Sequence, residues 1–310
     1  MPTLNNMIDE TLINLAGYTF QQDRSTYLAT AISTTTSSSA SPLIMSLGST
    51  DSVGKGIVEI EEELLWVDNY DRIANTATVA PYGRGYLGTT AATHAADTKV
   101  TISPTFPRHS IKRAINDTIR SLGANIFAVK TTTFTFNSAV STYAFANMNI
   151  KNIITVSWQE IGPSKEWRPI RRYDFDPTAN AEAFGYTTGT DIVQTITLGE
   201  APVSGRTVKV TYATDPEPFT TNVQDYAVQT GLPESTRDVV ILGAAYRLLS
   251  FLDPARAAQV SPQADETDNK RPFGASGTAT KQLYALYQQR LKEETDRQQA
   301  QYPIRVHYSR

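Results

Sequence analysis

The chain reads Arg84-Gly85-Tyr86-Leu87-Gly88-Thr89-Thr90-Ala91-Ala92-Thr93-His94 in the middle of a segment, Ile57 to Ile102, that is otherwise strand-like. Glycine tolerates positive φ angles, and the residues from Thr89 to Ala92 are too small to build a core. We therefore interpret the quoted stretch as a tight surface turn between β-strands. Together with the closing strand Lys99-Val100-Thr101-Ile102, it predicts a small β-domain.

Two strand-like runs precede this turn. Glu63 to Val67 and Asn75 to Val79 flank Asp68-Asn69-Tyr70-Asp71, and this order predicts an antiparallel hairpin with its turn at residues 68–71. The hydroxyl-rich tract 33–41 predicts an exposed loop. The acidic residues between positions 59 and 63 lack the spacing of an EF-hand, so we interpret them as a solvated strand edge.

A second β-rich unit is predicted over residues 130–219. It contains β-branched runs such as Thr207-Val208-Lys209-Val210-Thr211-Tyr212, punctuated by glycines. Between its strands, residues 167–177 alternate cations with aromatic side chains. That composition suits either single-stranded nucleic acid or the edge of a sandwich in contact with another subunit. Two aspartates in the stretch reduce its positive charge and favour the edge.

Helical periodicity occurs at four places, near residues 5–17, 107–127, 234–252 and 278–300. The second has an apolar stripe of Ile111, Ile115, Ile119 and Leu122. The fold class is therefore α+β, with a helical-bundle frame and two inserted β-rich units of the small β-barrel or sandwich type. The predicted division is a helical domain of residues 1–22, 104–129 and 220–310, a β-domain of 23–103 and a second β-domain of 130–219.

Two further stretches are candidates for contact with partners. The second helix carries Arg108, Lys112, Arg113 and Arg120, which form either a solvated face or a basic lining that meets DNA phosphates. Near the end of the sequence, Tyr302, Ile304, Val306 and Tyr308 alternate as a strand does. A strand edge without a partner needs a receiving sheet, so we expect this tail to pair with another chain.

Composition limits the function. Lys and Arg number 28 against 31 Asp and Glu, a net charge of -3, so no global basic field holds nucleic acid. There is no cysteine, and the three histidines stand far apart in sequence without a metal-binding motif. We expect no catalytic residue, no cofactor, no metal and no enzyme activity. No apolar run reaches the ~20 residues of a membrane span, which predicts a soluble protein made in the host cytoplasm.

The runs Arg237-Asp238-Val239-Val240-Ile241-Leu242-Gly243-Ala244-Ala245 and Lys281-Gln282-Leu283-Tyr284-Ala285-Leu286-Tyr287-Gln288-Gln289-Arg290 resemble the head-to-tail connector (adaptor or neck) proteins of tailed bacteriophages. The Ile57–Ile102 unit resembles a small β-domain of phage virion proteins. The resemblance implies a structural virion protein of the neck, at the head-tail interface. It implies a homo-oligomeric ring, typically a dodecamer, beneath the portal protein. Such a ring also contacts a downstream neck or tail protein and lets double-stranded DNA pass without sequence specificity.

Within this resemblance, Arg108, Lys112, Arg113 and Arg120 become candidate channel or lateral contacts, and the alternating tail becomes a candidate portal dock. Arg84, Tyr86 and His94 are expected on an exposed β-lip. The alternative is a tail-side or receptor- or glycan-binding virion protein, which the Ser/Thr-rich composition and 15 tyrosines also suit. The location of helices discriminates between them, because a receptor binder needs β-structure throughout.

Overall fold

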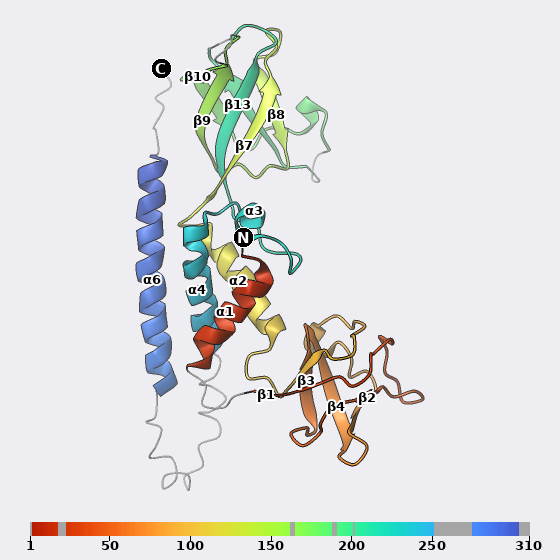
Figure 1. The fold of residues 1–310 in the computed structure, drawn as a ribbon. Helices are drawn as coiled ribbons and strands as arrows, with labels where there is room; N and C mark the ends of the chain where they lie inside the picture. Colours follow the sequence, from red (N-terminus) through yellow and green to blue (C-terminus); the bar gives the residue numbers. More distant parts are fainter. Residues whose placement is uncertain are drawn as a thin grey trace. The chain divides into compact units, whose positions relative to one another are not determined.

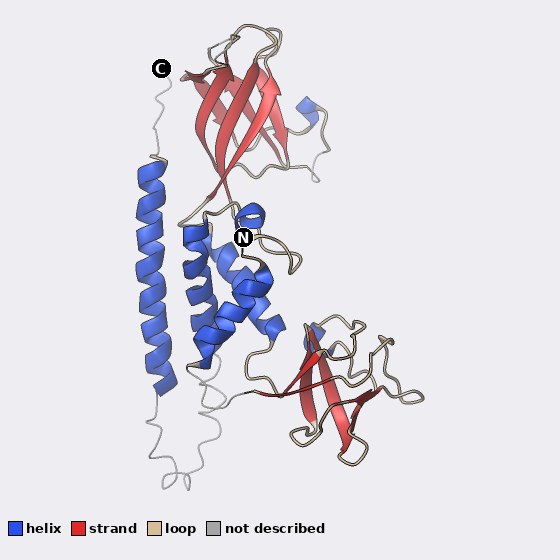
Figure 2. Cartoon of the chain, viewed as in Figure 1, coloured by secondary structure: helices blue, strands red, loops and turns tan. Residues whose placement is uncertain are grey.

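The computed structural model describes residues 2–17, 23–161, 165–187, 191–200, 202–250 and 275–303 (Figure 1). These residues form a mixed α and β fold with three antiparallel sheets (Figure 2). The chain divides into two compact units. Unit 1 is Met1–Leu4, Asn116–Val240 and Ala285–Arg310; unit 2 is Asn5–Ile115 and Ile241–Tyr284. The α+β prediction is confirmed, whereas the three-domain division remains a prediction.

Unit 2 contains a six-stranded sheet in the order β1-β6-β3-β4-β5-β2. Its strands are β1 (Arg24–Tyr27), β2 (Ile44–Ser46), β3 (Gly56–Ile60), β4 (Glu63–Asp71), β5 (Thr76–Val79) and β6 (Lys99–Ile102), with the 3-10 turn η1 (Tyr86–Gly88) between β5 and β6. The two outer strands meet just beyond their ends. Leu28 and Leu47 form an antiparallel bridge, and the N–H of Gly48 donates to the carbonyl of Tyr27 at 2.9 Å. The sheet thereby closes on itself around a buried aliphatic core.

The predicted hairpin is present, but its turn lies further along the chain. β4 continues to Asp71 and pairs with β5, with a register shift between Val67 and Asn69. The turn is made by residues 72–75, where the Asp71 carboxylate accepts the N–H of Ile73 at 2.8 Å. The expected turn at 68–71 was wrong because a bulge lets polar residues continue a strand whose outer face is exposed.

The helices form at the four expected places: α1 (Leu4–Ala16), α2 (Arg108–Leu122), α4 (Arg237–Ser250) and α6 (Ala275–Gln301). Two short elements, α3 (Tyr226–Thr230) and η3 (Glu234–Thr236), precede α4. The expected stripe of α2 is fully buried from Ile111 to Leu122. This helix ends earlier than residue 127, at Leu122. A Cβ added at the following Gly123 would lie 2.1 Å from Oδ1 of Asp215, so that side chain would have to shift.

The second β-rich unit is a sandwich inside unit 1. One sheet has the order β10-β9-β13-β7 and the other β11-β12-β8. The strands are β7 (Ala128–Thr135), β8 (Thr142–Ala146), β9 (Asn152–Gln159), β10 (Trp167–Ile170), β11 (Tyr173–Asp176), β12 (Val193–Leu198) and β13 (Thr207–Thr214), with η2 (Glu182–Phe184) before β12. Both sheets contribute to one core, for example through Val208 and Ile196. The stretch 167–177 supplies two edge strands, as the edge interpretation predicted.

The left-handed conformation and close packing of Gly231 in unit 1 can be tested by substitution. It ends α3 with a φ of +70°, and an added Cβ would lie 2.9 Å from the Cβ of Ala128. Gly185 has a similar φ of +79° with open space around it. Strain at a left-handed position costs roughly 1–2 kcal/mol, and the clash adds roughly 1–3 kcal/mol. We expect Gly231→Ala to lower the free energy of unfolding in urea clearly more than Gly185→Ala, and equal losses would contradict the close packing.

Candidate functional site

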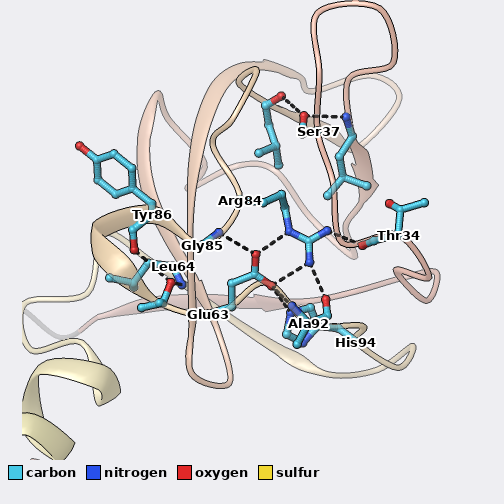
Figure 3. A network of polar contacts seen from close by, with 12 residues as sticks. Thr34, Ser37, Glu63, Leu64, Arg84, Gly85, Tyr86, Ala92 and His94 are labelled. Carbon is cyan, nitrogen blue, oxygen red and sulfur yellow. Dashed lines mark hydrogen bonds and ion pairs between the residues drawn. The ribbon is translucent and has the colours of Figure 1, made fainter.

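A buried network of charged groups joins the quoted turn to strand β4 (Figure 3). Its centre is Glu63, whose carboxylate accepts five hydrogen bonds. The donors are Arg84 Nε at 2.5 Å, Arg84 Nη2 at 2.8 Å, Gly85 N at 3.1 Å, Ala92 N at 3.0 Å and His94 Nε2 at 2.9 Å. The Arg84 guanidinium also donates to the carbonyls of Thr34 and Ala92, both at 2.5 Å. Strand β4 and the turn from Arg84 to His94 therefore meet at one carboxylate, and Arg84 extends the network to Thr34.

The turn residues have the conformations that this network requires. Gly85 has a φ of +61°, and a Cβ there would lie 2.7 Å from the carbonyl oxygen of Thr89. With glycine in place, its N–H reaches Glu63. The Thr89 hydroxyl accepts the N–H of Leu64 at 3.0 Å and donates to the carbonyl of Tyr86 at 3.0 Å. Each of these turn residues thus shapes or fastens the loop.

His94 bridges two carboxylates. Its Nε2 faces Glu63 and its Nδ1 faces Glu61, each at 2.9 Å. Both nitrogens donate only when the ring is protonated. The hydrogen bond to Glu63, opposed by burial and aided by Glu61, raises the pKa of His94 above its ordinary value. Burial alone would raise the pKa of Glu63, but the hydrogen bonds from Arg84, His94 and two backbone amides outweigh it and lower the pKa to about 2.

The prediction that Arg84, Tyr86 and His94 lie on an exposed β-lip is wrong for two of these three residues. The side chains of Arg84 and His94 are 3% and 1% exposed, and Tyr86 is half-buried. The acidic run is likewise not a solvated edge throughout, because Glu59 and Glu63 are buried. A signal was present in the sequence for Glu63: it alternates with Leu65 and Val67 along β4 and so lies on their apolar face, and a buried carboxylate requires a cation partner.

Glu59 is the second buried carboxylate of unit 2. It accepts the N–H of Arg108 at 2.5 Å, at the first residue of α2, where a helix presents unpaired N–H groups. Burial raises its pKa to about 7, against the lowering effects of the Arg108 hydrogen bond and charge and of Lys99, while Asp23 raises it further. The β-domain and the start of α2 are therefore joined by a group that titrates near neutrality.

The candidate channel cations on α2 mostly have carboxylate partners in their own chain. Arg108 contacts Asp9 at 2.6 Å, and Lys112 contacts Glu62 at 3.2 Å. Arg120 contacts Asp117 at 3.0 Å one turn earlier. Arg113 and Arg120 are exposed. The helix does not gather these cations into one basic site.

Unit 1 contains a hollow of about 310 Å³ between the start of β7, the residues before α4 and the end of α6. Gln298 crosses its rim, since its side-chain amide accepts from the N–H of Phe127 at 3.0 Å and donates to the Phe127 carbonyl at 2.6 Å. Tyr302 lines the hollow, and its ring lies 6.4 Å from that of Phe127. The other candidate tail residues, Ile304, Val306 and Tyr308, lie outside the described residues.

A family model for the SU10 adaptor protein matches residues 87–307, more than two thirds of the chain. The chain belongs to the SU10 adaptor protein family. It is accordingly a phage structural adaptor, a virion component that interacts with other virion proteins. No curated protein matches the sequence. The family match includes His94 but begins after Glu63 and Arg84.

The described part of the chain has neither a metal site nor a membrane-spanning helix. Within the described ranges, no group of three or more histidine, cysteine or acidic side chains is arranged to hold a metal ion. None of the helices described combines the length and apolarity required to cross a membrane.

The Glu63 carboxylate should stabilise the adaptor strongly. In Glu63→Gln, the new amide group points N–H donors at other donors, and Arg84 is left buried without its counter-charge. Breaking a buried pair costs roughly 3–5 kcal/mol. The control Asp68→Asn removes an exposed charge of the same strand, 4.0 Å from Lys55, and should cost under about 0.5 kcal/mol. We expect urea unfolding and amide exchange in β4 and β6 to show this difference; similar losses would refute it.

Glu59 should make stability fall with rising pH. The folded chain keeps this carboxyl protonated to about pH 7, against 4.5 for the free group. The folded state therefore binds more protons in that window, and stability declines as pH rises through it. Glu59→Gln keeps the acceptor for Arg108 and should raise the free energy of unfolding at pH 8 by on the order of 2 kcal/mol.

The measurement is urea unfolding at pH 5 and pH 8. His94 contributes a decline of the same sign, because its raised pKa gives stability that is complete below 6.5 and is lost as pH rises through the folded value. That part of the decline should persist in Glu59→Gln. Asp68→Asn should retain the whole decline. An unchanged slope in Glu59→Gln would show that Glu59 does not titrate differently on folding.

Proposed function

We propose that this adaptor assembles as a homo-oligomeric ring beneath the portal protein, in the neck of the virion, with double-stranded DNA passing through it. Family membership carries the proposal. The four helices at the predicted places support it, because the receptor- or glycan-binding alternative requires β-structure throughout. We also propose that these helices form one frame and that the two β-units are insertions into it.

The charges of α2 agree with a channel that DNA slides through. Tight binding to DNA arises when many cations replace counterions on the phosphates. Arg108, Lys112 and Arg120 instead each have a carboxylate neighbour, which lowers the field that they present. We propose that Arg108, Lys112, Arg113 and Arg120 line the channel or make lateral contacts, and that they interact with DNA weakly and without sequence specificity.

The tail beginning at Tyr302 is the proposed portal dock. Tyr302 itself packs in unit 1, against Phe127, so the segment that pairs with a portal strand begins after it and includes Ile304, Val306 and Tyr308. A strand added to another sheet gains main-chain hydrogen bonds along its length. The proposed downstream partner is a neck or tail protein.

The proposal predicts rings in electron micrographs of the purified adaptor with its portal, with dodecameric symmetry. Removing residues 303–310 should leave Tyr302 packed and the ring intact, and should abolish co-sedimentation with the portal. A control that replaces the same eight positions by a Gly/Ser segment should behave as the truncation does. A chain that stays monomeric with the portal, or that forms a trimer, would contradict the ring; unchanged portal binding would contradict the dock.

A further inference from the structure

Strand β7 is the last strand of its sheet, and one of its two sides has no partner strand among the described residues. Neighbouring residues of an antiparallel strand face alternately toward the partner and away from it. The N–H of Phe136 donates to the Arg206 carbonyl at 2.7 Å, so the even-numbered positions face β13. Val129, Thr131 and Thr133 therefore direct their main-chain N–H and carbonyl groups away from the sheet.

Phe127, directly before β7, has the same outward orientation, and there the end of α6 supplies the partner. The side-chain amide of Gln298 bonds both main-chain groups of Phe127, and the Tyr302 N–H donates to the Gln298 carbonyl at 2.8 Å. The hollow of about 310 Å³ is lined by Tyr302 from the end of α6 and by Val129 from β7. The chain that leaves α6 therefore starts beside open space, where the unpaired side of β7 begins.

The composition of β7 suits the addition of a further strand. Natural sheets protect their open edges with proline or with charged residues. The edge strand β10 contains Pro169, and the edge strand β11 contains Asp174 and Asp176. β7 has eight residues and no proline, and its one charged residue, Lys130, forms an ion pair with Glu217. Its open side therefore needs a cover in the free protein.

The residues that follow Pro303 have the pattern of such a cover. Residues 304–309 alternate strictly between apolar and polar side chains, beginning with Ile304, and contain no proline. On β7, Phe134 packs against the sandwich core while partly exposed, and its ring stacks on that of Tyr143 at 4.1 Å. A strand with one apolar side, placed beside β7, extends the apolar face on which Phe134 lies.

We propose that residues 304–309 pair as a parallel strand with the open side of β7 in their own chain until the portal is present. The Tyr302 ring lies 6.4 Å from that of Phe127, so the tail starts at the end where β7 starts and runs in the same direction. With the apolar residues turned toward the core, His307 lies beside Thr131 on the outer face.

The later fate of this strand rests on the proposed portal dock. The portal sheet then receives a strand that β7 gives up, and the two sheets compete for one segment. Competition of this kind lowers the apparent affinity for the portal by the fraction of tail that is free. In return, the tail of one copy does not pair with the sheets of other copies before assembly.

The sequence has no cysteine, so a disulfide can report the pairing. In Thr131→Cys with His307→Cys, the two Cα atoms would lie about 5 Å apart, within the range for a disulfide. The control is Thr155→Cys with His307→Cys, because Thr155 lies level with Thr131 with β13 between them, about 14 Å from the added strand. On oxidation of the adaptor alone, we expect an intramolecular link in the first variant and none in the control. Equal linking in both, or links only between copies, would overturn the pairing.

Amide hydrogen exchange of the full chain without portal is the second test. The amides of Val129, Thr131 and Thr133 should exchange about tenfold or more slowly relative to a variant that releases the tail. That variant carries Ile304→Asp, Val306→Asp and Tyr308→Asp. The matched control carries Arg305→Asp, His307→Asp and Ser309→Asp. The control should keep the protection because its changes face solvent, and the Thr132 amide, which faces β13, should be unaffected in both. Fast exchange of the three amides in the parent chain would overturn the pairing.

Adding the portal separates this inference from the proposed function. Bound portal should speed the exchange of the same three amides to the rate of the releasing variant. A portal that binds while these amides stay protected would refute the transfer of the strand. A portal that does not bind at all would refute the proposed dock, and the pairing measured on the adaptor alone would stand.

Discussion

The carboxylate of Glu63 is the constraint on which the β-domain depends. A buried negative charge persists only when donors replace the water that it has lost. Here a guanidinium, an imidazole ring and two backbone amides do so. The sequence spacing of the turn follows from that need. Arg84 supplies the counter-charge, Gly85 brings its amide within reach, and the small residues up to Ala92 let the chain return so that His94 arrives on the far side.

The helices and the sandwich strands were predictable because their signals are local. A stripe such as Ile111 to Leu122 repeats within one element, and the same side chains that define the period fill the core. The β-branched runs of β9 and β13 are likewise signals contained within one strand. The end of α2 was predicted too late: the helix ends at Leu122, directly before Gly123, while the buried Ile126 continues the apolar spacing beyond that end.

The site was less predictable from the sequence because its contacts join residues that lie far apart in the chain. Whether Arg84 lies on a lip or in a core depends on Glu63, twenty-one positions earlier, and on the closure of the sheet that brings the two together. Charged residues near glycines are exposed in most proteins, and that rule failed here because the partners were separated in sequence. Tyr86, whose hydroxyl-bearing ring rests on Trp66, kept partial exposure.

Gln298 gives the long helix α6 an unusual end. Its side-chain amide presents one acceptor and one donor to Phe127, in the way that a neighbouring peptide group of a sheet would. The last turns of α6 are thus attached to the chain that enters β7 by a surrogate for main-chain pairing. This clamp holds the last turns of α6 against the chain that enters β7, so the helix terminus keeps one fixed register relative to Phe127.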